Sequence, residues 1–89
     1  MITLTGRLIC TDAAQAALVR LYLPDHIRLT RAEPGCLSFD VVPTGDPLVW
    51  QVNETFTDRA AFDAHQTRTR ESRWFRETAP IRREFQIIG

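Results

Sequence analysis

The sequence predicts an α+β protein in which two helices cover one face of a single antiparallel sheet. Four stretches alternate apolar and polar residues, as half-buried strands do, and two segments between them repeat apolar residues at helical spacing. Proline and glycine separate several of these stretches. The expected strands are residues 2–9, 37–42, 48–56 and 83–88. The order of elements is that of a ferredoxin-like βαββαβ fold, and the 89 residues make one domain.

The first strand is expected to place Ile2, Leu4 and Leu8 on the face that the helices cover. Asp12 begins the first helix in a capping-box pattern, with Gln15 three positions later. The apolar residues that recur at helical spacing in this segment are Ala14, Ala17, Leu18 and Leu21. This pattern predicts the face of the first helix that packs on the sheet.

Pro24 lies inside the same helical segment. It either kinks the helix or opens a second segment at its first turn. We expect His26 to lie on the exposed side of this segment. The segment ends at Glu33-Pro34-Gly35, because Pro34 disfavours the helical conformation of Glu33 and Gly35 can take the positive φ of a sharp reversal.

A carboxylate lies on the apolar face of the third strand. The residues that share this face are Trp50, Val52, Glu54 and Phe56. A buried carboxylate needs a partner, because an unpaired charge is costly inside a protein. The second helix follows a cap at Thr57-Asp58 and places His65 on its inner side, with Arg68 alongside. His65 and Arg68 are therefore the expected partners of Glu54.

The aromatic residues of the strands are expected beneath the helices. They are Phe39, Trp50, Phe56 and Phe85. RNA-binding domains with the same strand order present stacking aromatics on the open face of the sheet instead. The opposite face is polar here, and it is either solvated or in contact with a second subunit. The pattern therefore argues against a nucleic-acid partner.

Composition excludes several classes of function. Acidic and basic residues balance at 11 each, so the chain has no global attraction to nucleic acid or to an acidic membrane. Every basic residue is arginine, which excludes lysine-based catalysis. Cys10 and Cys36 have no metal-ligand spacing, which argues against zinc and iron–sulfur ligation. We also expect a cytoplasmic protein, because no export signal or membrane-spanning run is visible.

Three motifs carry a resemblance to a known family and together span most of the chain. They are Thr30-Arg31-Ala32-Glu33-Pro34-Gly35-Cys36-Leu37, Trp50-Gln51-Val52-Asn53-Glu54-Thr55-Phe56, and Phe62-Asp63-Ala64-His65. In this order they resemble the antibiotic biosynthesis monooxygenase family, whose members are dimeric α+β barrels. Two features depart from the family pattern. Phe56 stands where many members have tryptophan, and the polar helical tail from His65 to Trp74 is longer.

The resemblance implies a cofactor-independent monooxygenase that oxidises a quinol, an anthrone or a related aromatic with O2. In such a reaction the substrate supplies the electrons, because a deprotonated phenol is rich enough in electrons to reduce O2. The protein supplies an apolar cavity, a base and the orientation of the reactants. The resemblance implies no flavin, haem, metal or other cofactor. The implied partners are a small aromatic substrate, O2 and a second copy of the chain.

His65 is the candidate base, because the ordinary pKa of histidine lies near working pH. Glu54 is its candidate catalytic partner, although a purely structural pair of the same residues has the same sequence pattern. Trp50 and Trp74 could stack on a planar substrate. Alternatively, Trp50 belongs to the core, and Trp74 lines the mouth of a cleft or a dimer contact. The remaining candidate substrate contacts are Asn53, Phe56, Phe62 and Arg68.

Two other functions remain open at this point. A non-catalytic dimer of the same fold would bind a small apolar ligand or stabilise a partner in a pathway. A haem-degrading enzyme of this fold would also carry a helix histidine. That group uses an asparagine in the first strand, however, and the strand here reads Ile2-Thr3-Leu4-Thr5-Gly6. The sequence therefore favours the other two functions.

Overall fold

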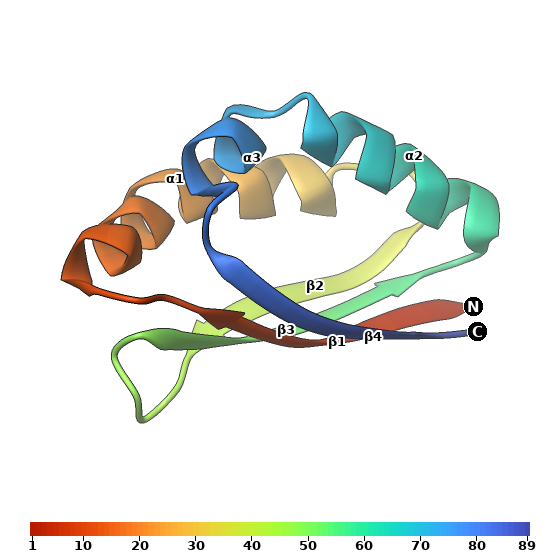
Figure 1. Cartoon of the computed structure of the whole chain (residues 1–89). Coiled ribbons are helices and arrows are strands. Elements are labelled where there is room, and N and C mark those ends of the chain that lie inside the picture. Colours follow the sequence, from red (N-terminus) through yellow and green to blue (C-terminus); the bar gives the residue numbers. More distant parts are fainter.

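The computed structural model describes residues 1–89 and contains one four-stranded antiparallel sheet with three helices on one side (Figure 1). The elements are β1 (Ile2–Ile9), α1 (Ala13–Arg31), β2 (Cys36–Pro43), β3 (Val49–Phe56), α2 (Arg59–Arg70), α3 (Arg73–Thr78) and β4 (Arg82–Ile88). The strands lie in the order β2-β3-β1-β4. The predicted ferredoxin-like fold is confirmed, with the difference that the second helical segment is divided into α2 and α3.

The alternation in the strands sets which side chains meet the helices. Leu4 pairs with Glu54 and Ile2 pairs with Phe56 across β1 and β3, and all four residues are buried. Asn53 pairs with Thr5 and points to the other, solvated face. Because neighbouring residues of a strand face opposite sides, this register places the Glu54 carboxylate under the helices.

Helix α1 begins at the predicted cap, where the Asp12 carboxylate accepts a hydrogen bond from the Gln15 N–H at 2.9 Å. It then runs to Arg31 as one helix, with Pro24 inside it on the exposed side. The buried face differs from the predicted one: the buried residues are Ala16, Val19, Leu23, His26 and Thr30. Ala14, Ala17 and Leu21 are exposed and Leu18 is half-buried.

The expectation of an exposed His26 is therefore wrong, since only 5% of this residue is accessible. The buried face of α1 includes a histidine and a threonine, so it is less apolar than the exposed face that contains Leu21. Counting apolar residues selects the wrong side of a helix when polar side chains are buried in a specific cluster.

The reversal after α1 brings the end of this helix beside the start of α2. Gly35 has φ of +86°, and a Cβ at this position would lie 2.6 Å from the Cβ of Ala61. The carbonyl of Gly35 also accepts a hydrogen bond from the N–H of Thr57 at 2.8 Å. Only glycine combines this conformation with this close approach. Glu33, two residues earlier, is thereby held next to α2.

A second cap divides the polar segment after α2. The Ser72 hydroxyl accepts a hydrogen bond from the Phe75 N–H at 3.1 Å and starts α3. This short helix packs against α1 and buries Trp74. None of the helices is both long enough and apolar enough to span a bilayer.

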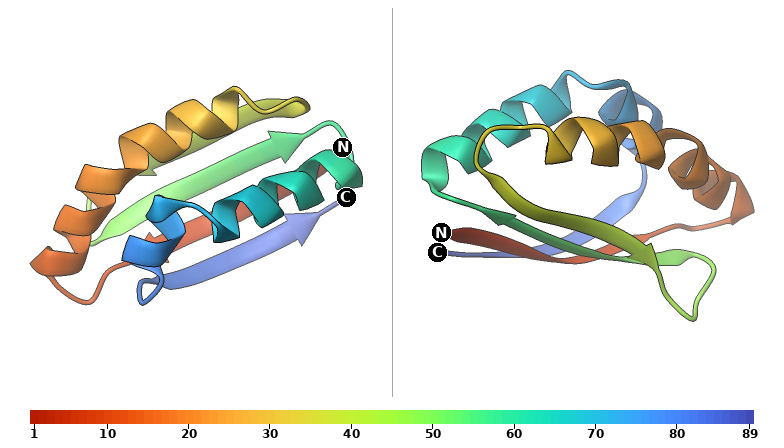
Figure 2. Two further views of the ribbon diagram at one scale, coloured as in Figure 1. Left: turned by 90° about the horizontal axis from the view of Figure 1, so that it is seen from above. Right: turned by 180° about the vertical axis from the view of Figure 1, so that it is seen from behind.

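The helices leave one edge of the sheet less covered. Viewed from above, α1 lies on the β2 side, α2 lies on the β4 side, and β3 is seen between them (Figure 2). Phe85 and Ile87 of the edge strand β4 point to the helix side of the sheet but are 40% and 47% exposed. Phe85 was expected beneath the helices with the other strand aromatics. It is exposed because the helical layer ends before this edge.

Candidate functional site

A cavity of about 280 Å³ lies between the sheet and the helices. Its apolar wall comes from the sheet and is made by Leu4, Leu8, Phe39, Val41 and Val52. Histidine, glutamate and tryptophan side chains complete the interior: His26, Glu54, His65 and Trp74. Arg70 and Phe85 are exposed and also line it, so the cavity opens toward the β4 edge. The site thus combines an apolar hollow with a small group of buried titratable side chains.

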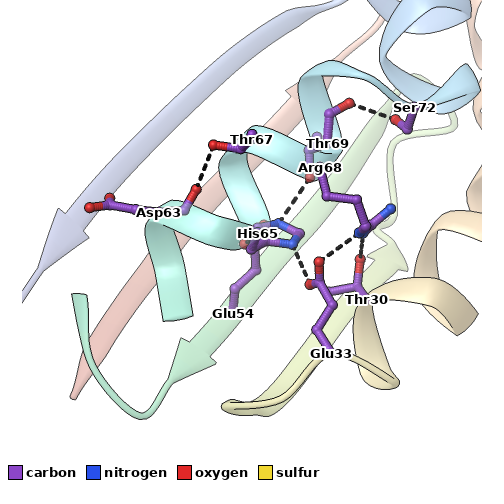
Figure 3. Close-up of polar contacts among 9 residues, drawn as sticks. All are labelled: Thr30, Glu33, Glu54, Asp63, His65, Thr67, Arg68, Thr69 and Ser72. Carbon is purple, nitrogen blue, oxygen red and sulfur yellow. Dashed lines mark hydrogen bonds and ion pairs between the residues drawn. The ribbon is translucent and has the colours of Figure 1, made fainter. Parts of the chain in front are cut away.

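His65 of α2 is held by a carboxylate from the end of α1. Its Nδ1 lies 2.7 Å from Oε1 of Glu33, and its side chain is 2% exposed (Figure 3). Because a carboxylate only accepts hydrogen bonds, Nδ1 carries the proton and donates it to Glu33. Nε2 is then the acceptor of the neutral ring, and its contact is the Thr69 hydroxyl at 3.4 Å. The Glu33 contact therefore fixes both the tautomer and the orientation of His65.

Arg68 completes the support of Glu33 from the same helix. Its Nε donates to Oε2 of Glu33 at 2.6 Å, and its Nη2 donates to the Thr30 hydroxyl at 2.8 Å (Figure 3). Both oxygens of Glu33 are thus engaged, one by a cation and one by the imidazole. Hydrogen bonds with an ionised donor or acceptor are stronger than those between neutral groups, so the carboxylate is held firmly in place. Arg68 was expected beside Glu54 and instead pairs with Glu33.

Glu54 of β3 lies on the other side of the imidazole. Its Oε1 is 3.5 Å from Nε2 of His65, which is too long for a strong hydrogen bond, and this atom has no other partner. Burial, reinforced by the nearby Glu33 carboxylate, raises the pKa of Glu54 from 4.5 to about 7. Burial lowers the pKa of His65, and the hydrogen bond to Glu33 opposes that shift. Near neutral pH, one proton can therefore move between Glu54 and His65.

Phe56 packs against the His65 imidazole, and Phe62 packs against Phe56. The Phe56 ring lies 4.9 Å from the His65 ring, and Phe62 packs on Phe56 at 5.6 Å between centroids. Both phenylalanines are buried in the core and neither lines the cavity. They hold His65 in position through packing.

The structure brings three of the eight predicted site residues to the cavity: His65, Glu54 and Trp74. Trp50 is buried in the core outside it, and Asn53 lies on the opposite face of the sheet. Sequence reasoning missed Glu33 as the partner of His65, and it placed His26 in solvent. The only signal for Glu33 was its position in the turn that ends α1.

No group of three or more histidine, cysteine, aspartate or glutamate side chains is arranged to hold a metal ion. Both cysteines are free, and burial raises the pKa of each thiol. The chemistry that the site offers is proton transfer at a buried imidazole, next to an apolar space.

Fold and site together define a small α+β protein with an apolar cavity that opens at the β4 edge and a carboxylate-oriented histidine in its wall. The sequence model of the antibiotic biosynthesis monooxygenase family matches residues 1–77. The chain belongs to this family, and the resemblance of the three motifs is confirmed.

Solved structures of low sequence identity have the same fold. A candidate antibiotic biosynthesis monooxygenase from Nitrosomonas europaea is 18% identical, with a TM-score of 0.83 over 100% of this chain and 97% of that one. Rv0793 from Mycobacterium tuberculosis is 22% identical, with a TM-score of 0.77 over 99% and 92%. SnoaB, a cofactor-independent oxygenase from Streptomyces nogalater, is 12% identical, with a TM-score of 0.81 over 99% and 90%.

At these identities the likeness establishes the fold alone. A search of curated protein sequences finds no match to this chain. The function therefore has to be argued from the family and from the site.

Proposed function

We propose that this protein is a homodimeric, cofactor-independent monooxygenase that oxidises an anthrone, a quinol or a related hydroxyaromatic with O2. The observation that carries the proposal is the geometry of His65. Its Nδ1 is bonded to Glu33 at 2.7 Å, and its side chain lies in the wall of an apolar cavity. An oriented, neutral imidazole beside an apolar space is the arrangement that general-base catalysis on a phenol requires.

The proton step takes place at Nε2 of His65. The hydroxyl of the substrate, which for an anthrone is that of its hydroxyanthracene tautomer, donates its proton to this nitrogen. Glu33 stabilises the imidazolium that forms, because its carboxylate remains bonded to Nδ1. Glu54, whose pKa lies near 7, exchanges this proton with His65 between the steps of the reaction. The base, His65, and the group that exchanges protons with it, Glu54, therefore line the same cavity.

The oxygen step uses the electrons of the substrate. The anion passes one electron to O2, and the resulting radical pair combines to form a C–O bond and a peroxide. The peroxide takes the proton back from His65 and loses water, which leaves a carbonyl group on the ring. In sum, an anthrone and O2 give an anthraquinone and water, and one atom of O2 enters the product. The apolar walls exclude water from the anion and favour electron transfer.

Oxygen consumption with a panel of anthrones, naphthohydroquinones and benzohydroquinones tests the proposal. Wild type should accelerate uptake over the protein-free rate with at least one class. His65→Asn should lose about a hundredfold or more of that acceleration, because general-base catalysis contributes about 10²–10⁴-fold. Asp63→Asn, an exposed change on the same helix, is the matched control and should stay within about twofold. Equal rates for wild type and His65→Asn would refute the assignment of the base.

A non-catalytic binding protein is the second candidate. It is favoured by the full engagement of Glu33, because a network of this kind also serves to stabilise the fold. Quenching of tryptophan fluorescence would report binding, since Trp74 lines the cavity. Binding of the aromatic panel without any catalysed oxygen uptake would support this second function over the first.

A further inference from the structure

His26 of α1 is a buried polar side chain among aromatic rings. Its ring stacks on Trp74, with centroids 5.2 Å apart and planes within 10°, and it meets Phe39 edge to face at 5.4 Å. Both histidines of the protein, His26 and His65, line the same cavity. A phenylalanine would satisfy the packing at position 26, so the nitrogens of this ring require an explanation of their own.

One nitrogen of His26 is buried without a partner in the protein. Nδ1 is shut off from solvent and has no hydrogen-bond partner. Only one other buried side-chain atom shares this condition, Oε1 of Glu54. Both residues line the cavity. Buried polar groups are nearly always hydrogen-bonded, and leaving one unpaired costs stability. These two side chains therefore indicate that the cavity binds a polar guest ligand.

The two imidazoles are close enough to contact one oxygen atom of such a guest. Their ring centroids lie 5.9 Å apart, with planes tilted by 37°. An oxygen that is hydrogen-bonded to one nitrogen of a ring lies about 4 Å from the centroid, so it can be shared by rings up to about 8 Å apart. The observed separation therefore allows a single hydroxyl to meet both rings.

The charge state of His26 suits a hydrogen-bond donor. Burial lowers the pKa of His26 to about 3, and the charges of Arg68, His65 and Arg83 lower it as well. The ring is therefore neutral at working pH and carries one N–H. A neutral imidazole can stabilise a developing oxyanion without competing for the proton that leaves it.

We propose that His26 is a second catalytic residue, which donates an N–H hydrogen bond to the phenolic oxygen of the substrate as His65 removes its proton. This inference rests on the proposed function and adds to it the residue that stabilises the anion. The substrate hydroxyl gives its proton to His65 and accepts the hydrogen bond of His26, so no further reactant is needed. The stack on Trp74 and the contact with Phe39 keep the donor in place.

The acidity of a bound phenol that O2 does not oxidise tests this role. Nitrophenols serve as probes, because their phenolate form absorbs visible light and reports the bound pKa by titration. His26→Phe keeps the stacking on Trp74 and removes the donor. Its bound nitrophenol should titrate about one to two pKa units higher than in wild type, as loss of a hydrogen bond to a charged group predicts. His26→Gln restores an N–H donor and should recover part of the shift.

Arg28→Gln, an exposed change on α1, is the matched control and should leave the bound pKa unchanged. The role of His26 is overturned if the nitrophenol titrates equally in wild type and His26→Phe, or if no member of the nitrophenol series binds wild type. The titration does not need O2. If the nitrophenol pKa shifts as expected but the protein does not consume oxygen, the monooxygenase function alone is refuted. If wild type and His26→Phe consume oxygen at equal rates, the role of His26 alone is refuted.

Discussion

Glu33 is the residue on which the orientation of His65 depends. Its two oxygens accept hydrogen bonds from Nδ1 of His65 and Nε of Arg68, at 2.7 and 2.6 Å. It does not line the cavity, so it is a positioning residue. Its effect on the reaction passes through the tautomer and the basicity of the imidazole.

Replacement of this carboxylate by an amide should show both effects. In Glu33→Gln the turnover should fall about tenfold to a hundredfold, because a misplaced base is much less effective. The hydrogen bond and charge of Glu33 raise the pKa of His65, so their loss lowers it. Since the base works in its neutral form, the acid limb of the pH–rate profile should move to lower pH. An unchanged acid limb in a folded variant would contradict the positioning role.

Glu54 should make the stability of the protein depend on pH. Its pKa is about 7 in the folded state against an ordinary 4.5, so the folded protein binds the proton more tightly than the unfolded chain. The contribution of Glu54 to stability is therefore present at low pH and is lost as pH rises from about 5 to 8. Over that range the stability of Glu54→Gln relative to wild type should increase by about 3 kcal/mol, measured by urea unfolding. A constant difference between the two proteins would contradict the raised pKa.

At the residue level, the sequence indicated the pairing of His65 with Glu54 because each lies at the inward position of a regular element. It could not indicate Glu33 as the main partner. That contact joins residues 32 positions apart and depends on how the end of α1 passes beside α2. His26 was placed on the wrong side of its helix because a stacked, unprotonated imidazole is buried like an aromatic ring, whereas composition counts it as polar.

Among the elements, the turn from α1 to β2 is the one that assembles the site. The positive φ of Gly35 and its contact with Ala61 place Glu33 within reach of His65. The same turn was the clearest signal in the sequence, because proline and glycine stand together after a helical pattern. The break between α2 and α3 was less visible, since Ser72 caps a helix of only six residues.

A methyl group at this turn should destabilise the protein. Gly35→Ala forces a side chain into a left-handed conformation and against Ala61, and we expect a loss of about 1–3 kcal/mol. Gly45→Ala is the matched control. A Cβ at Gly45 meets no atom within 4 Å and its φ is not positive, so the change should lie within about 0.5 kcal/mol. Equal free energies of unfolding for the two variants would show that the turn is not strained.

At the scale of the whole molecule, 89 residues enclose a small core, and association is a common support for domains of this size. The open face of the sheet is polar but also exposes Val42 and Ile88. The proposed dimer closes this face against a second copy. It leaves the cavity, which lies on the helix side, open to its substrate.

Light scattering at micromolar concentration should give about twice the chain mass of 10.2 kDa. Ile88→Glu places a charge on the open face and should reduce the mass to that of one chain, because a buried unpaired carboxylate is costly. Leu21→Glu adds the same charge to an exposed position of α1 and should leave the dimer intact. A single-chain mass for wild type would contradict the dimer.

The fold of the molecule could be predicted because strand alternation and turn residues are local signals. The cavity could not, because its walls come from α1, α2, α3 and all four strands, and its size depends on how the helices sit over β4. Trp50 and Trp74 illustrate the limit. Both are buried tryptophans, and only their place in the assembled layers separates the one in the core from the one in the cavity.

The most direct test of the account is a crystal structure of the protein with a hydroxyaromatic ligand, obtained without oxygen. The account predicts that the aromatic ring occupies the cavity against Trp74. It also predicts that the hydroxyl oxygen lies about 3 Å from Nε2 of His65, within hydrogen-bonding distance of a nitrogen of His26. A cavity closed by side chains, or a ligand whose hydroxyl points away from both imidazoles, would contradict it.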